Sequence, residues 1–168
     1  MNDKKIRDNV VMVDVNGDVT RLEKAMVTIS AQGEMTYAEY LDMSDVVCLL
    51  DVSECDEDGL EGLCDAIARL DSHEVNTLRA VLEHHHGMKR IFTIDEVEYY
   101  LPTFRNYYIL LEDVIHLYDF GMYIFDNYMD TGMYDGIRHD IDYKKIGNAL
   151  IMDGKAAQTS LGYLMILR

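Results

Sequence analysis

Residues 118–142, YDFGMYIFDNYMDTGMYDGIRHDID, combine dense negative charge with many large apolar side chains. The stretch has six aspartates and one arginine among tyrosines, methionines and phenylalanines. Disordered acidic segments contain few such residues. They stay disordered because they cannot bury enough apolar surface to offset the entropy of ordering. We therefore expect the stretch to fold and to carry its unbalanced charge on an ordered surface.

Charge is distributed unevenly along the 168 residues, whose formal net charge is −16. Residues 1–30 contain five acids and five bases, residues 31–142 contain 25 acids and six bases, and residues 143–168 contain one acid and four bases. So large a net charge destabilises a compact state through self-repulsion. A purely solubilising charge would have little reason to concentrate in one part of the chain. We infer an acidic surface directed at a positively charged partner.

Direct binding of nucleic acid is not expected, because it requires cations against the phosphates. The apolar content, 49% of the residues, suits one compact domain or two to three small ones. Cys48, Cys55 and Cys64 are odd in number and have no paired spacing. No apolar h-region follows the opening residues, and no apolar run is long enough to span a bilayer. These features predict a cytoplasmic protein with reduced thiols.

The N-terminal part alternates apolar and polar residues around Asn16-Gly17. This pattern predicts a β-hairpin with a type I′ turn, in which both central residues need positive φ. Residues 25–31 read as another strand, residues 36–43 as a short helix and residues 46–52 as a closing strand.

The central part has apolar residues at helical spacing from residue 58 and again from residue 72, where Gly87 supplies a stop. A third helix is expected after Thr93, which has Glu96 three residues on in the capping-box position. Pro102 ends this helix. Three short helices are therefore expected within residues 57–101.

In the C-terminal part, residues 106–111 read as a strand and residues 112–129 as a helix, followed by a loop. Residues 142–150 are expected to form one or two helical turns. Two further strands are expected on either side of residues 153–160.

Together these elements predict an α+β fold built as an elongated chain of small subdomains. Residues 1–52 are expected to form an N-terminal β-rich subdomain with antiparallel strands and a short helix. Residues 53–102 would form an acidic subdomain of short helices. Residues 103–168 would form a C-terminal α+β subdomain with a small antiparallel sheet.

Three motifs invite a metal-binding interpretation, and each also has a simpler one. Consecutive histidines at 84–86 point about 100° apart on a helix, so they do not converge as histidines at i and i+4 would. Residues 14–25 begin like a calcium loop, but Val19 and Ala25 stand where glycine and glutamate are needed. The acids of residues 55–59 precede a helix, where the helix dipole favours them.

Neither a glycine-rich phosphate loop after a strand nor a nucleophile elbow occurs in the sequence. The carboxylates are so abundant that no pair stands out as a general acid and base. We therefore expect no enzyme activity, no cofactor and no dedicated metal site.

The spacing of the acids supports a different idea. In residues 91–142 only Arg105 and Arg138 oppose eleven acids. Acids four residues apart on a helix lie about 6 Å apart along its axis, and duplex DNA carries one charge per about 3.4 Å on each strand. A folded surface with acids on several segments can therefore approach the spacing of negative charges along a phosphate backbone. The simpler interpretation is a solvated acidic face.

Three stretches resemble the ArdA-type antirestriction proteins carried by plasmids, conjugative transposons and phages. They are YYILLEDVIHLYDFGMYIFDN (107–127), HDIDYKKIGNALIMDGKAAQTSLGYLMIL (139–167) and, more weakly, LEGLCDAIARLDSHEVNTLRAVLE (60–83). The resemblance covers about residues 58–168. The N-terminal part departs from the family pattern, because the first thirty residues are charge-neutral and the chain lacks tryptophan.

The resemblance implies an elongated homodimer whose acidic face imitates bent duplex DNA. It implies binding to the DNA-recognition core of Type I restriction-modification enzymes, which blocks restriction and sometimes modification. Such a protein works by occupancy and has no catalytic residues to carry over. The acids that the resemblance assigns to the partner-binding surface are Glu112, Asp113, Asp119, Asp126, Asp130, Asp135, Asp140 and Asp142, followed by Asp95, Glu96 and Glu98.

Two alternatives remain open at the level of sequence. The chain could be an acidic adaptor for another basic partner, or a carboxylate-rich cation-binding protein that uses the acidic clusters and the histidines. In either case Arg138 is the odd residue of the acidic stretch. We expect it to pair with a nearby aspartate or to turn away from the acidic face.

Overall fold

A computed structural model describes residues 10–21, 46–87, 91–129, 136 and 138–167. The fold is α+β, as predicted, and the chain forms two compact units, residues 1–103 and 104–168. The predicted division at residue 52 falls inside the first unit, where strands on both sides of it share one sheet. Across the described ranges, no helix is both long and apolar enough to cross a bilayer.

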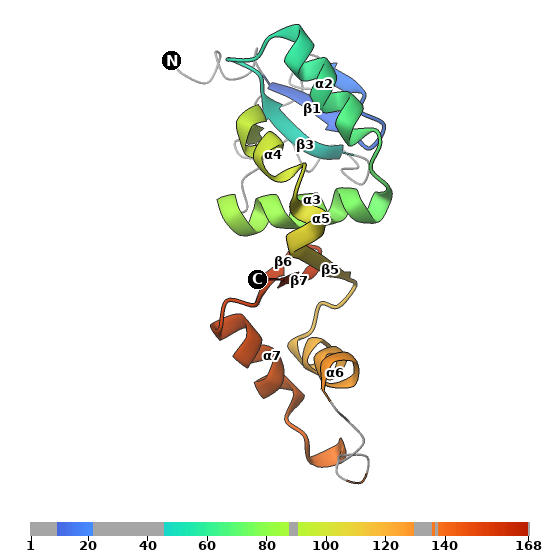
Figure 1. Ribbon diagram of the computed structural model, residues 1–168, viewed down its shortest axis with the longest axis vertical. Helices are drawn as coiled ribbons and strands as arrows, with labels where there is room; N and C mark the ends of the chain where they lie inside the picture. Colours follow the sequence, from blue (N-terminus) through green and yellow to red (C-terminus); the bar gives the residue numbers. More distant parts are fainter. Residues whose placement is uncertain (1–9, 22–45, 88–90, 130–135, 137, 168) are drawn as a thin grey trace, which may run out of the picture. The chain divides into compact units, whose positions relative to one another are not determined.

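The first unit contains a four-stranded sheet in the order β2-β1-β3-β4 (Figure 1). Its strands are β1 (Val10–Asp14), β2 (Val19–Arg21), β3 (Val46–Asp51) and β4 (Ile91–Thr93). β1 pairs antiparallel with both β2 and β3, which confirms the predicted hairpin and closing strand. β4 pairs parallel to β3 and was not predicted, because three residues are too few to show a period.

The hairpin turn differs from the predicted type I′. Gly17 has φ 76°, but Asn16 does not have positive φ. The Gly17 N–H donates to the Asp14 carbonyl (3.1 Å), and the Asp14 carboxylate accepts from the backbone of Asn16 (2.8 Å) and Asp18 (3.0 Å). The loop is therefore a three-residue turn that ends in a glycine bulge. The aspartate stabilises it by satisfying two loop N–H groups.

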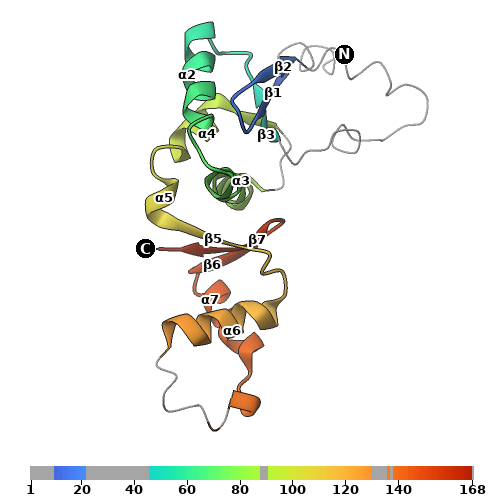
Figure 2. The same cartoon turned by 90° about the vertical axis from the view of Figure 1, so that its right-hand side faces the viewer.

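All three predicted central helices are present: α2 (Glu57–Ile67), α3 (Ser72–His86) and α4 (Ile94–Tyr100). Their apolar faces are buried, for example Ile67 of α2 and Leu78 of α3. Figure 2 shows the three helices beside the sheet of the first unit.

The ends of these helices follow the sequence signals. Thr93 and Glu96 form the predicted capping box of α4, with reciprocal hydrogen bonds of 3.2 and 3.0 Å. Asp71 and Glu74 form a second capping box at the start of α3. α3 stops at Gly87, whose φ of 75° is easily adopted only by glycine.

The second unit contains a three-stranded antiparallel sheet in the order β5-β7-β6 and two main helices. Its elements are α5 (Phe104–Tyr107), β5 (Tyr108–Glu112), α6 (Leu117–Tyr128), η6 (Arg138–Asp140), α7 (Tyr143–Met152), β6 (Ala156–Thr159) and β7 (Gly162–Ile166). The predicted strand, helix and small antiparallel sheet are therefore present, with shifted boundaries.

Three boundaries were predicted wrongly, for local reasons. The short helix α5 occupies the first residues of the expected strand at 106–111. α6 begins at Leu117 rather than residue 112, because Asp113 has φ 64° and interrupts any helix there. α7 continues to Met152, beyond one or two turns, so the expected strand before residue 153 is helix.

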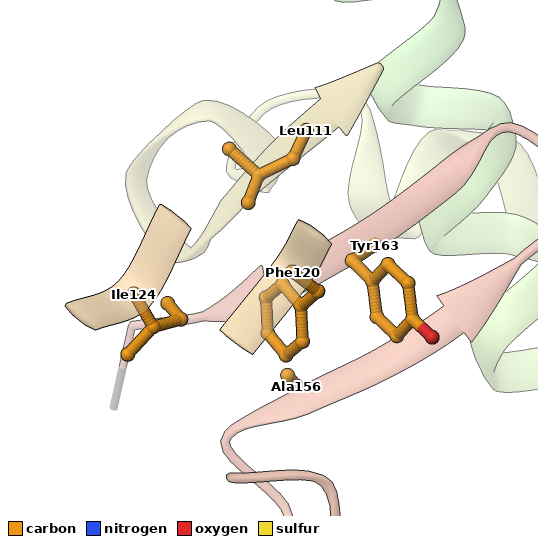
Figure 3. Packing of buried hydrophobic residues seen from close by; sticks show 5 residues of the cluster. All are labelled: Leu111, Phe120, Ile124, Ala156 and Tyr163. Carbon is orange, nitrogen blue, oxygen red and sulfur yellow. The ribbon is translucent and has the colours of Figure 1, made fainter. Parts of the chain in front are cut away.

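The core of the second unit lies between its sheet and α6 (Figure 3). The rings of Phe120 and Tyr163 are stacked, with centroids 4.3 Å apart and planes 2° from parallel. Leu111, Ile124 and Ala156 complete the cluster. This cluster fixes α6 against the sheet.

Two glycines allow α6 and α7 to pack with close backbones. A Cβ at Gly121 of α6 would overlap the carbonyl oxygen of Tyr143, and a Cβ at Gly147 of α7 would press on Leu117 and Phe120. The apolar spacing predicted a helix here, but only the structure explains why these positions are glycine.

Several predictions lie outside the described residues. They are the strand at 25–31, the helix at 36–43 and the acids Asp130 and Asp135.

Candidate acidic interface

Two helices of the first unit begin at the same edge of its sheet. The parallel strands β3 and β4 end together, with Asp51 opposite Thr93. β4 leads directly into α4, and a short loop connects β3 to α2. Carboxyl ends of parallel strands are a common position for binding sites in α/β sheets.

A hollow of about 410 Å³ lies at this edge. Five carboxylates line it: Asp51, Glu54, Asp56, Asp95 and Glu98. None of the described residues that line it is basic. The structure thus brings two of the predicted acids, at 95 and 98, together with three that sequence reasoning did not select.

α2 adds a regular row of carboxylates. Glu57, Glu61 and Asp65 are four residues apart and all exposed. On a helix this spacing places them about 6 Å apart along the axis. The opposite side of α2 is buried through Leu63 and Ile67, so the row is held on a fixed scaffold. The four-residue spacing was visible in the sequence and could have identified this row.

Several acids of the first unit lie at helix N-termini, where negative charge is favourable. The Asp56 carboxylate caps α2 by accepting from the Gly59 N–H (2.7 Å). Asp95 lies in the first turn of α4, and Glu57 and Asp58 lie in the first turn of α2. The positive end of a helix dipole stabilises negative charge at such positions.

The side chain of Glu96 is mostly buried and is held by contacts within the first unit. One of its oxygens accepts the Thr93 N–H, and the other lies 3.0 Å from Nδ1 of His86. Both side chains of this pair are about four-fifths buried. Glu96 therefore serves the start of α4 and its contact with α3, in contrast to its predicted place on the partner-binding surface.

Cys55 lies in the hollow beside the carboxylates. Desolvation raises the pKa of its thiol, and the neighbouring Asp56 and Glu98 carboxylates raise that pKa further. The thiol is therefore held in its neutral form near neutral pH. The same carboxylates would favour a cationic group in the hollow.

In the second unit, the predicted acids differ in their exposure. Asp113 and Asp140 are exposed, whereas Glu112 and Asp119 are partly buried. Asp142 is exposed and caps α7 by accepting from the Lys145 N–H (3.1 Å).

Arg138 behaves as predicted, because it forms an ion pair with Asp126. Its guanidinium also lies 5.8 Å from the centre of the Phe125 ring. Asp126 is thus partly neutralised and contributes less to the acidic surface than its neighbours.

The histidines of α3 do not converge on one point. His85 stacks on Tyr100 with ring centroids 4.7 Å apart, and His86 contacts Glu96. Within the described ranges, no three His, Cys, Asp or Glu side chains are arranged to hold a metal ion.

No protein-family model, curated protein or solved structure matches this chain.

Proposed function

We propose that this chain is an antirestriction protein that acts as a DNA mimic in the cytoplasm. In this proposal its carboxylates occupy the DNA-recognition core of a Type I restriction-modification enzyme and exclude DNA. The protein works by occupancy, with no chemical step and no cofactor.

The ordered row of carboxylates on α2 carries the proposal. A mimic of phosphate needs negative charges at regular spacing on a rigid surface. Glu57, Glu61 and Asp65 are four residues apart on one helix, which supports the proposal. The acidic hollow beside them extends the negative surface. In the second unit, Asp113 and Asp140 are further exposed charges.

A restriction-protection assay tests the function directly. Unmodified phage or plasmid is introduced into cells that carry a Type I system, with and without this protein. Expression should raise the recovery of unmodified DNA toward that of restriction-deficient cells. Full restriction in the presence of soluble, folded protein would contradict the proposal.

Binding to the purified methyltransferase core should compete with target DNA and weaken as salt rises. The reason is that contacts between exposed charges are screened within about 10 Å at 0.1 M salt. An affinity that stays constant between low and moderate salt would count against a mimic of phosphate.

Group neutralisation identifies the carboxylates that matter. The triple variant Glu57→Gln, Glu61→Gln, Asp65→Asn should weaken binding about three- to a hundredfold, if each exposed contact contributes about 0.2–1 kcal/mol. Neutralising the exposed acids between residues 112 and 142 in groups should weaken it progressively, with no single residue decisive.

A charge-matched control separates position from net charge. The variant Asn106→Lys, Asn148→Lys, Gln158→Lys changes the net charge by the same +3 at exposed positions of the second unit. It should bind more tightly than the α2 variant. Equal loss in both would mean that overall charge, rather than the α2 carboxylates, determines affinity.

The acidic hollow also suits an adaptor for another basic partner. A pull-down from host lysate distinguishes the two functions. Recovery of ribosomal or histone-like proteins without restriction subunits would favour the adaptor.

A further inference from the structure

A groove of about 590 Å³ lies between the β1–β2 hairpin and α2 in the first unit, and we call it the hairpin groove. Its apolar floor consists of Val11, Val19, Val52 and Leu60. Val19 is 43% exposed, and Val52 and Leu60 are half-buried. Apolar side chains that gather in an open groove in this way indicate a contact surface.

The two walls of the hairpin groove are held together at Gly17. A Cβ at this position would overlap the Cys64 carbonyl oxygen of α2 and press on Ala68. The hairpin turn therefore packs directly on α2, which is itself anchored through its buried Leu63 and Ile67. Because both walls belong to packed elements, the groove is formed before a partner binds, which lowers the entropic cost of binding.

The rim of the hairpin groove carries negative charge. Its charged residues are exposed carboxylates: Asp56, Glu57, Glu61 and Asp65. None of the described residues that line the groove is basic. Burial raises the pKa of the Cys64 thiol in the groove, and the carboxylates of Asp65 and Asp14 raise that pKa further. The same negative potential favours a cationic group at the rim.

This lining requires two properties of a partner, apolar side chains for the floor and positive charges for the rim. A neutral apolar segment would desolvate carboxylates without pairing them, which is costly. A polycation without apolar side chains would leave the floor exposed to water. A second copy of this chain, with its net charge of −16, would be repelled.

The spacing of the rim carboxylates favours a helical partner. Glu57, Glu61 and Asp65 are four residues apart and therefore about 6 Å apart along α2. Lys or Arg residues four apart on a second helix have the same spacing, and apolar residues at helical spacing beside them form one stripe. An amphipathic helix of this kind binds with its apolar stripe facing into a groove.

We propose that the hairpin groove binds a basic amphipathic helix of a partner protein. The apolar side chains of that helix lie on the floor, and its Lys and Arg residues pair with the carboxylates of α2. This inference rests on the proposed function and deepens it, because it names the class of segment that the α2 carboxylates contact. It also adds an apolar contact that a phosphate backbone does not offer.

Fluorescence anisotropy of labelled peptides with the full chain tests the groove. The probe is a helical peptide of about 18 residues, long enough to form a helix, with leucines on one face and lysines four residues apart beside them. It should bind. Replacing its leucines by glutamine, at the same charge, should weaken binding about tenfold or more. Replacing its lysines by glutamine should weaken binding and remove its salt dependence.

The variant Val19→Thr tests the floor. Threonine keeps the β-branched shape that suits β2, but it replaces a methyl group by a hydroxyl that binding would desolvate. Affinity for the probe should fall about fourfold or more, with the salt dependence of the wild-type chain. Ile91→Thr is the matched control, because Ile91 is 38% exposed in β4, at the other end of the sheet and outside the groove. It should bind the probe as tightly as wild type.

Several results would overturn the proposal. They are a probe that does not bind, a leucine-free or lysine-free peptide that binds as tightly as the probe, and a Val19→Thr variant that binds like wild type. A dimer of the full chain that Val19→Thr disrupts would assign the groove to a second copy instead. Restriction protection is measured separately. Protection without probe binding would contradict the groove alone, and probe binding without protection would contradict the antirestriction function alone.

Discussion

At the scale of single residues, the carboxylates of this protein have different tasks. Asp56 caps a helix, Glu96 satisfies a capping box and contacts His86, and Asp126 neutralises Arg138. Glu61 and Asp65 are exposed on the outer side of α2. The number of Asp and Glu residues in the sequence therefore overestimates the number of carboxylates available to a partner, because some of them stabilise the fold.

Cys48 makes the stability of the first unit sensitive to high pH. Burial raises the pKa of its thiol from 9.0 to about 12. Above pH 9 the unfolded thiol loses its proton while the folded thiol keeps it, so the free energy of unfolding falls as pH rises from 9 toward 12. At pH 10.5 this loss is about 2 kcal/mol. Urea denaturation at pH 8 and pH 10.5 measures it.

Cys48→Ala is the control for that measurement, since it removes the thiol and leaves the other titrating groups. Its own loss of stability between the two pH values should be smaller by about 2 kcal/mol. Identical losses in both proteins would show that Cys48 is not buried as described.

At the scale of elements, the two units are built in different ways. In the first unit, cap residues begin the helices and the sheet joins distant segments, as when β4 pairs with β3. In the second unit, two glycines bring α6 and α7 together over the stacked rings of Phe120 and Tyr163. Local signals therefore define the helices of the first unit, and close packing defines the helix pair of the second.

Gly121→Ala should destabilise the second unit by about 3 kcal/mol, because the new methyl group overlaps the Tyr143 carbonyl and separates the helices. Gly62→Ala is the matched control. It lies in α2, where an added Cβ meets nothing within 4 Å, and helix propensity predicts a gain of up to about 1 kcal/mol. Denaturant titration of both variants tests the contrast. A stabilising Gly121→Ala would contradict the close approach of α6 and α7.

At the scale of the whole molecule, negative charge is a cost to folding that a partner of opposite charge would relieve. Eight acids of the first unit line the hollow or form the α2 row, and none of the described residues that line the hollow is basic. Self-repulsion of this kind is screened by salt.

The melting temperature should therefore rise by about 4 °C or more between about 20 mM and 500 mM NaCl. The triple variant Glu57→Gln, Glu61→Gln, Asp65→Asn should show a smaller rise, because less repulsion remains to be screened. Differential scanning calorimetry measures both. A melting temperature that is insensitive to salt in the wild-type chain would mean that the acids are already compensated within the fold.

The sequence alone determined the features that depend on neighbouring residues. Periodicity and caps predicted α2, α3 and α4, and the alternation around Gly17 predicted a hairpin, since these signals act within a few residues. The pairing of Arg138 with an aspartate also followed from local charge. The concentration of Asp and Glu in residues 31–142 is likewise a property of the sequence.

Only the tertiary structure decided which acids face the same way. The parallel pairing of β3 with β4 brings Asp51 and Asp56 beside Asp95 and Glu98, although about forty residues separate the two segments. It also placed Glu96 in a contact with His86 instead of on the open surface. Pairing between distant strands depends on burial and register over the whole unit, and no local pattern carries that information.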